Sequence, residues 1–169
     1  NRNITVEDVD TTPRRFSGYG LYLAGPDHDV IGVSSTLRSI GVLASAASNF
    51  TVDGLSARRG VTGLYLQSVP NTPASFSPPN LSDLELTDNT TALVLYSWAL
   101  PVTLDPSIGL DAAGSDTAIA ITTNSANITL SGFTLRDHPS QSINVAATTT
   151  NIRIQNGDFS GLGIGNGIT

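Results

Sequence analysis

The sequence lacks the residues that disulfide frameworks and many metal sites require. It contains no cysteine and only two histidines among its 169 residues. The absence of cysteine excludes disulfides and thiolate-bound metals, and two histidines are too few for a metal site built from imidazoles alone. We therefore expect no metal site and no other cofactor.

Charged residues are also scarce. Asp, Glu, Lys and Arg together make up 13% of the chain, and 14 acidic residues against 8 basic ones give a net charge of −6. A protein that binds nucleic acid gains its affinity by neutralising phosphates with clustered basic residues. No basic stripe is present, so we expect no nucleic acid among the partners.

Long apolar runs and methionine are missing as well. No run approaches the roughly 18 apolar residues of a membrane-spanning helix, and no signal sequence opens the chain. We therefore expect no membrane insertion. Because the sequence has no methionine, even at position 1, it suggests a processed product or a segment of a longer protein. Its length predicts a single domain over residues 1–169.

What the sequence does contain is a repeated phrase. Each copy begins with Asn or Asp and continues with alternating apolar and small polar residues. Copies begin at Asn3, Asp29, Asn49, Asn80, Asn127 and Asn151. The gap of 47 residues before Asn127 is about twice the other gaps. It predicts one unmarked copy, beginning near residues 100–104.

A second apolar phrase follows each start. Its copies lie at residues 20–23, 40–43, 63–66, 92–95, 118–121 and 142–145. Alternation with β-branched residues, broken by Gly, Asn, Asp and Pro, is typical of short strands, and helical periodicity is missing. A repeat this short buries its apolar face only by stacking on its neighbours in parallel register. We therefore predict an all-β solenoid of about seven coils.

The phrase at residues 127–135, Asn-Ile-Thr-Leu-Ser-Gly-Phe-Thr-Leu, and its echoes at 49–55 and 151–159 resemble the right-handed parallel β-helix of the pectate-lyase-like superfamily. The resemblance covers nearly the whole chain. The superfamily includes polysaccharide lyases, glycoside hydrolases, uronan epimerases, phage tailspikes and surface adhesins. It therefore implies a fold and contact with polysaccharide, but it names no activity. A β-sandwich is the alternative fold.

Three arginines recur at a fixed distance from the coil starts. Counting nine residues on from Asp29, Asn49 and Asn127 gives Arg38, Arg58 and Arg136. In-register stacking would place Arg38 beside Arg58.

The coil that begins at Asn127 adds further charge, because Asp137 and His138 follow Arg136. Guanidinium groups form paired hydrogen bonds with carboxylates, so this stripe predicts a binding site for an anionic sugar polymer. The alternative is that these arginines occupy solvent-facing turns and pair with neighbouring carboxylates.

A catalytic cluster is not evident from the sequence. Asp83, Glu85 and Asp88 form the densest acidic group, and the alternation points Glu85 outward. Residues 22–28, Tyr-Leu-Ala-Gly-Pro-Asp-His, resemble the Tyr-Gly-x-Asp-Pro-His phrase of alginate epimerases, but their order and spacing differ. Whether the protein is an enzyme stays open. If it is one, the resemblance implies a polysaccharide lyase, a hydrolase or a uronan epimerase.

Five asparagines belong to Asn-x-Ser/Thr sequons: Asn3, Asn49, Asn80, Asn89 and Asn127. Four of them coincide with coil starts, where asparagine tolerates left-handed turn geometry. Its side-chain amide can also form hydrogen bonds with the equivalent residues of stacked coils. The sequence therefore predicts a structural role for these four. Glycosylation would require a secreted product of a glycosylating host.

Together these features predict an extracellular, cell-surface or virion β-helix domain that binds or processes polysaccharide. The alternative is a structural spacer or self-assembling surface module without catalytic activity. A solenoid exposes apolar core at its ends unless caps cover them, and the sequence shows no amphipathic helix that would serve as a cap. This alternative predicts self-association through the solenoid ends.

Overall fold

The computed structural model describes residues 4–7, 10–11, 18–45, 49–67, 79–99, 102–104, 110–135, 141–158 and 166–168. All regular secondary structure in these ranges is β-strand, arranged in two sheets, which we call sheet A and sheet B. The described part of the chain therefore contains no helix long and apolar enough to cross a membrane.

Each sheet takes its strands from along the whole chain. Sheet A contains β1 (Ile4–Glu7), β2 (Asp10–Thr11), β4 (His28–Ile31), β5 (Ser34–Thr36), β7 (Thr51–Arg58), β9 (Asn80–Glu85), β11 (Val102–Leu104), β12 (Leu110–Asp111), β14 (Thr129–Thr134) and β16 (Arg153–Asp158). Sheet B contains β3 (Tyr19–Ala24), β6 (Ile40–Ser45), β8 (Thr62–Gln67), β10 (Thr91–Tyr96), β13 (Thr117–Thr122), β15 (Gln141–Val145) and β17 (Asn166–Ile168).

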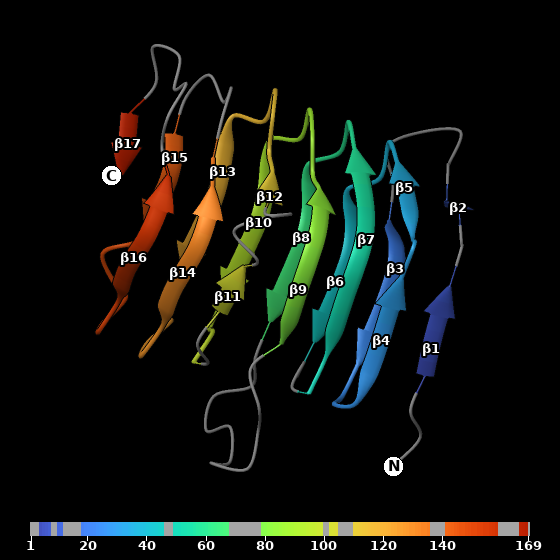
Figure 1. Ribbon diagram of the computed structural model, residues 1–169, viewed down its shortest axis with the longest axis horizontal. Helices are drawn as coiled ribbons and strands as arrows, with labels where there is room; N and C mark the ends of the chain where they lie inside the picture. Colours follow the sequence, from blue (N-terminus) through green and yellow to red (C-terminus); the bar gives the residue numbers. More distant parts are fainter. Residues whose placement is uncertain are drawn as a thin grey trace.

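The chain passes through the two sheets in turn, and every described strand pair is parallel. Strands of sheet A run in one direction, and those of sheet B return in the other (Figure 1). Along each sheet the strands follow chain order from one end of the molecule to the other. The predicted all-β parallel solenoid is confirmed, because a β-sandwich would pair antiparallel strands.

The number of fully stacked turns is somewhat smaller than the seven coils predicted. The main path of each sheet contains seven strands, but the first and last coils have a neighbour on one side only, which leaves about five turns stacked on both sides. The unmarked copy predicted near residues 100–104 is present as β11, which pairs with β9 and β14.

The core lies between the two sheets and consists of inward-pointing side chains stacked in columns. In β7, Val52, Leu55 and Ala57 are buried while the side chains between them face out. In sheet B, Leu64 pairs in register with Leu93, and Leu93 with Ile119. Each such side chain packs on its equivalents in the coils above and below. Burying one leucine fully contributes about 1.5–3 kcal/mol.

Left-handed residues mark the start of several coils. Asp27, Asn49, Asn127 and Asn151 have φ angles of 63°, 50°, 56° and 59°. The Asn49 amide donates a hydrogen bond to Asp27 Oδ1 over 2.9 Å, and the Asn151 amide donates one to Asn127 Oδ1 over 2.9 Å. Asparagine and aspartate adopt this backbone conformation at lower cost than most residues. The predicted structural role of these asparagines is confirmed at Asn49 and Asn127.

The fourth copy of the phrase is displaced along its strand. Asn80 pairs with Thr51 rather than with Asn49. In β9 the left-handed residue is Asp83, whose φ angle is 49° and which lies beside Gly54 at 68°. The pairing skips both residues and resumes at Leu55 and Leu84, so the two coils stay in register beyond this point.

Candidate functional site

The register of sheet A separates two of the arginines predicted to stack. Arg58 pairs with Thr36 in β5, so Arg38 lies two residues further along its coil and not beside Arg58. The cause is the choice of turn residue in the second coil. Asp27 adopts the left-handed conformation there, and Asp29 pairs with Thr51. Nine residues on from Asp27 is Thr36, which is the residue that pairs with Arg58.

The rest of the predicted arginine stripe, Arg136, Asp137 and His138, lies outside the described residues. Contact of these three, and of Arg38 and Arg58, with a ligand stays a prediction.

Arg58 forms an ion pair with Glu85, one strand away in β9. Ser56 Oγ donates a second hydrogen bond to the same carboxylate over 3.0 Å. The hydrogen bond from Arg58 lowers the pKa of Glu85, and the bond from Ser56 adds to this, while partial burial opposes them. The same contact raises the pKa of Arg58. This guanidinium already has a carboxylate partner within the protein, as the alternative interpretation of the arginines predicted.

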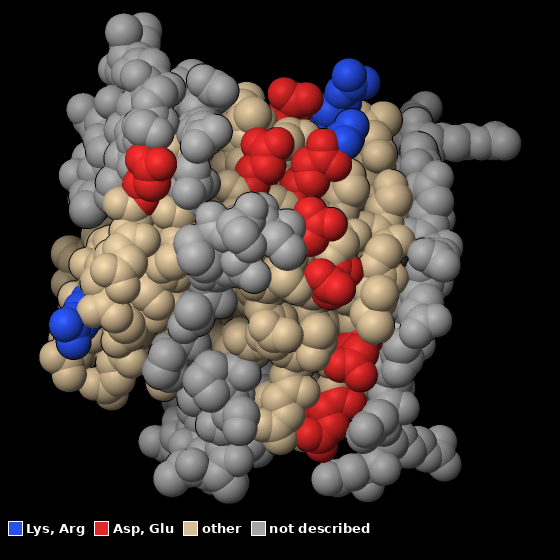
Figure 2. All heavy atoms as spheres, in the orientation of Figure 1, with Lys and Arg blue, Asp and Glu red and all other residues tan. Residues whose placement is uncertain are grey.

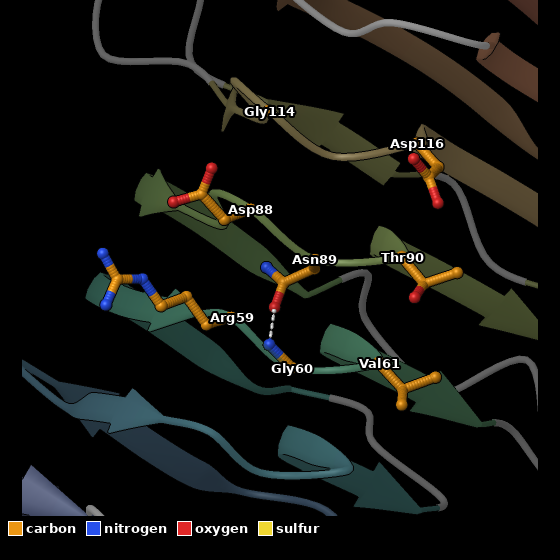
Figure 3. Close-up of a pocket in the computed structure, with 8 residues that line it drawn as sticks. All are labelled: Arg59, Gly60, Val61, Asp88, Asn89, Thr90, Gly114 and Asp116. Carbon is orange, nitrogen blue, oxygen red and sulfur yellow. Dashed lines mark hydrogen bonds between the residues drawn. The ribbon is translucent and has the colours of Figure 1, made fainter. Parts of the chain in front are cut away.

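A hollow of about 340 Å³ lies where the turns of three coils meet (Figure 3). Its lining residues are Arg59, Gly60, Val61, Asp88, Asn89, Thr90, Gly114 and Asp116. Figure 3 shows Arg59 and Asp88 on one side of Asn89, and Thr90 and Asp116 on the other. The charged groups therefore do not converge on one point of the hollow.

Asn89 forms the floor of this hollow and connects three coils. Its Nδ2 donates to Ala57 O over 2.9 Å, and its Oδ1 accepts from Gly60 N over 2.9 Å. Its backbone N–H donates to Ser115 Oγ over 3.1 Å, and Ser115 Oγ donates to Leu86 O over 2.9 Å. Only 3% of Asn89 is exposed. The amide of this sequon is thus a buried structural group and is inaccessible to glycosylation in the folded protein.

Acidic side chains gather on the outer face of sheet A, where Figure 2 shows them in a line across several strands. The acidic residues of β4, β7, β9 and β12 are Asp29, Asp53, Asp83, Glu85 and Asp111. Ser82 Oγ donates to Asp53 Oδ1 over 2.7 Å, and Glu85 pairs with Arg58. Among the described residues, no three His, Cys, Asp or Glu side chains come close enough together to hold a metal ion.

The structure separates Tyr22 from His28, the two ends of the phrase that resembles the epimerase motif. His28 is 5% exposed, and its Nε2 lies 3.1 Å from Ala24 O. Tyr22 lies on sheet B and is 53% exposed. The histidine is therefore part of the interior, where it cannot meet a polymer in solvent.

The outer face of sheet B carries a feature that the sequence analysis missed. None of the described strands of sheet B contains Asp, Glu, Lys or Arg. All four tyrosines of the protein lie in these strands. We call the outer side chains of β3, β6, β8 and β10 the tyrosine face: Tyr19, Tyr22, Leu43, Tyr65, Val94 and Tyr96.

The tyrosine rings lie close to one another. The ring centroids of Tyr19 and Tyr22 are 5.8 Å apart, and those of Tyr65 and Tyr96 are 5.9 Å apart with 30° between the ring planes. Tyr19 and Tyr22 are about half exposed. Burial raises the pKa of Tyr65, and neighbouring Tyr96 adds to the rise. The repeated Gly-Leu-Tyr-Leu phrase was the available signal, because its tyrosine alternates with two inward leucines.

These observations define the chain as a parallel β-solenoid with two chemically different outer faces. No protein-family model, curated protein or solved structure matches it. Membership of the pectate-lyase-like superfamily therefore stays a prediction. A fold shared by many functions does not name one, so the function must be argued from the chain's own surfaces.

Proposed function

We propose that this solenoid binds polysaccharide, and that the tyrosine face of sheet B is the binding surface. The observation that supports this proposal is the gathering of all four tyrosines on one sheet whose described strands carry no charge. Large exposed apolar surfaces on soluble proteins commonly mark interaction sites. Such a protein would act where polysaccharides occur: outside the cell, on its surface or on a virion.

The chemistry of tyrosine suits a sugar chain. A pyranose ring presents a face of C–H groups, and an aromatic ring presents a face with negative partial charge, so the two faces attract one another. Tyrosine adds a hydroxyl at its tip that hydrogen-bonds the polar rim of the sugar. Tyr22 and Tyr65 offer both groups on the outside of the solenoid.

Retention of the protein on insoluble polysaccharides tests the proposal. The wild-type protein should be retained on at least one polymer of a chemically varied panel, and the double variant Tyr22→Ala, Tyr65→Ala should lose that retention. Val61→Ala is a matched control, because Val61 is a half-exposed apolar residue in a turn outside the tyrosine face. Failure of every polymer to retain the wild-type protein would overturn the proposal.

A structural module is the second candidate function, favoured by the ends of the two sheets. In the described part of the chain, β1 and β3 at one end and β16 and β17 at the other pair with a strand on one side only. Open strand edges add further strands readily. This candidate predicts end-to-end oligomers in analytical ultracentrifugation, with no effect of the tyrosine substitutions on their formation.

A further inference from the structure

The ligand of the tyrosine face can be described more closely. We infer that it is an uncharged, extended polysaccharide of β-1,4-linked pyranoses, whose chain lies along the solenoid axis and crosses β3, β6, β8 and β10. This inference rests on the proposed function. It follows from two observations, the charge of the two outer faces and the register of the strands in sheet B.

The charge distribution favours a neutral polymer. The described strands of sheet B offer no cation to pair with an anionic sugar and no carboxylate to pair with a cationic one. The protein as a whole carries a net charge of −6, which repels polyanions. A polycation would instead be drawn to sheet A, where Asp29, Asp53 and Asp111 lie. An uncharged polymer is the class that sheet B matches.

The register of sheet B indicates that the polysaccharide chain runs along the solenoid axis. Tyr22 pairs with Leu43, Leu43 with Tyr65, and Tyr65 with Val94, so these four side chains occupy the same position in four successive coils. Tyr22 and Tyr65 are therefore two coils apart along the axis. Hydrogen-bonded strands lie about 4.8 Å apart, which makes the separation roughly 10 Å.

This separation matches the repeat of a β-1,4-linked chain. One coil spacing of about 4.8 Å is close to the length of one pyranose unit in an extended chain. Successive β-1,4-linked units are flipped, so the same ring face returns at every second unit. A polysaccharide chain lying along the solenoid axis would thus stack the same face of two sugar rings on Tyr22 and Tyr65. A polymer that coils, such as an α-linked glucan, would contact only one of them.

The residues between the two tyrosines make the strip continuous. Leu43 lies between Tyr22 and Tyr65 in the register, and Val94 lies beside Tyr65. Both are nearly buried. Tyr96 widens the strip beside Tyr65. Gln67 pairs with Tyr96 on the neighbouring strand and supplies an amide for sugar hydroxyls. An apolar strip with a few uncharged polar groups beside it is the usual composition of a small-ligand site.

Calorimetric titration with soluble oligosaccharides tests this inference. The probes are a neutral β-1,4-linked hexasaccharide of glucose or mannose, an α-1,4-linked glucose hexasaccharide and a hexasaccharide of galacturonate. Wild-type protein should bind the first most tightly, with an affinity that is the same at low and high salt, because no charge is involved. Tyr22→Ala and Tyr65→Ala should each weaken binding about tenfold.

Two control variants separate stacking from other effects. Tyr65→Phe keeps the ring and should retain most of the affinity, and Val61→Ala should retain all of it; circular dichroism shows whether each variant is folded. Tightest binding of the galacturonate, with a larger loss in Arg58→Ala than in Tyr65→Ala, would overturn this inference and the tyrosine face as the binding surface, and only polysaccharide binding itself would stand. Binding of no saccharide, with a protein dimer that Tyr22→Ala abolishes, would overturn both.

Discussion

Sheet A and sheet B share one kind of inner face and differ on their outer faces. Both bury columns of Leu, Ile, Val and Ala against each other. Outside, sheet A carries acidic side chains and the Arg58–Glu85 pair, whereas the described strands of sheet B carry no charge and hold every tyrosine of the protein. Stacking constrains the inner face of each coil, and the outer face is the part that remains available for recognition.

The largest effect should come from the inner columns. Leu93 lies between Leu64 and Ile119 and is fully buried, so Leu93→Ala should lower the free energy of unfolding by about 2–5 kcal/mol. The neighbouring Val94 lies outside the core cluster and beside Tyr65, and Val94→Ala should cost roughly 1–2 kcal/mol. Urea unfolding of both variants measures the difference. Equal losses would contradict the distinction between inner and outer faces.

The next effect concerns the turns that join sheet A to sheet B. Asn89→Ala would leave Gly60 N–H and Ala57 C=O without their partner in a buried turn. We expect a loss of about 2–4 kcal/mol in the free energy of unfolding, because each unpaired buried group costs about 1–3 kcal/mol. Thr90→Ala is the matched control, since Thr90 is the exposed neighbour in the same turn. A loss equal to that control would show that the Asn89 contacts add no stability.

Most strands of this fold could be predicted from the sequence, because alternation of side chains is a local property. Even β11 could be placed, since one gap between copies of the phrase was about twice the others. The register could not be predicted in the same way. Asp27 and Asp29 are chemically equivalent candidates for the turn, and the choice between them depends on where Asn49 lies in the next coil.

The candidate site was harder to predict for the same reason. The Gly-Leu-Tyr-Leu phrase shows that Tyr22 and Tyr65 point outward, but only the register shows that they stand in one line with Leu43 between them. The count that aligned Arg38 with Arg58 was wrong by two residues. In a strand, a residue that is misplaced along the chain meets different neighbours on the next strand. Pairing between coils, rather than local pattern, therefore determines what a face presents.

A smaller effect should follow from the left-handed turns. Asn49 has a φ angle of 50° and donates a hydrogen bond to Asp27, so Asn49→Ala should cost about 1–2 kcal/mol of stability. Asn49→Gly removes the same hydrogen bond but tolerates the backbone angle, and it should cost less. Thermal unfolding of the two variants separates the contributions. A glycine variant as unstable as the alanine variant would place the whole effect in the hydrogen bond.

The smallest effect should come from the Arg58–Glu85 pair on the outer face of sheet A. Both side chains are largely solvated, with 48% and 38% of their surfaces exposed. Exposed pairs contribute about 1 kcal/mol or less, so a double-mutant cycle of Arg58→Ala and Glu85→Ala should give a coupling below that value. Added salt should reduce it further. A coupling well above that limit would mean that the pair is shielded from solvent.

The same pair should show a defined pH dependence. Folding lowers the pKa of Glu85, chiefly through the hydrogen bond from Arg58. A carboxyl group that binds its proton less tightly in the folded state stabilises the fold above its usual pKa of 4.5, and that contribution disappears as the pH falls through the lowered value. Urea midpoints measured from neutral pH to well below 4.5 should therefore fall more steeply in the wild-type protein than in Glu85→Gln. Parallel curves would show that Glu85 titrates alike in the folded and unfolded chains, and that the acidic face of sheet A adds no stability through this residue.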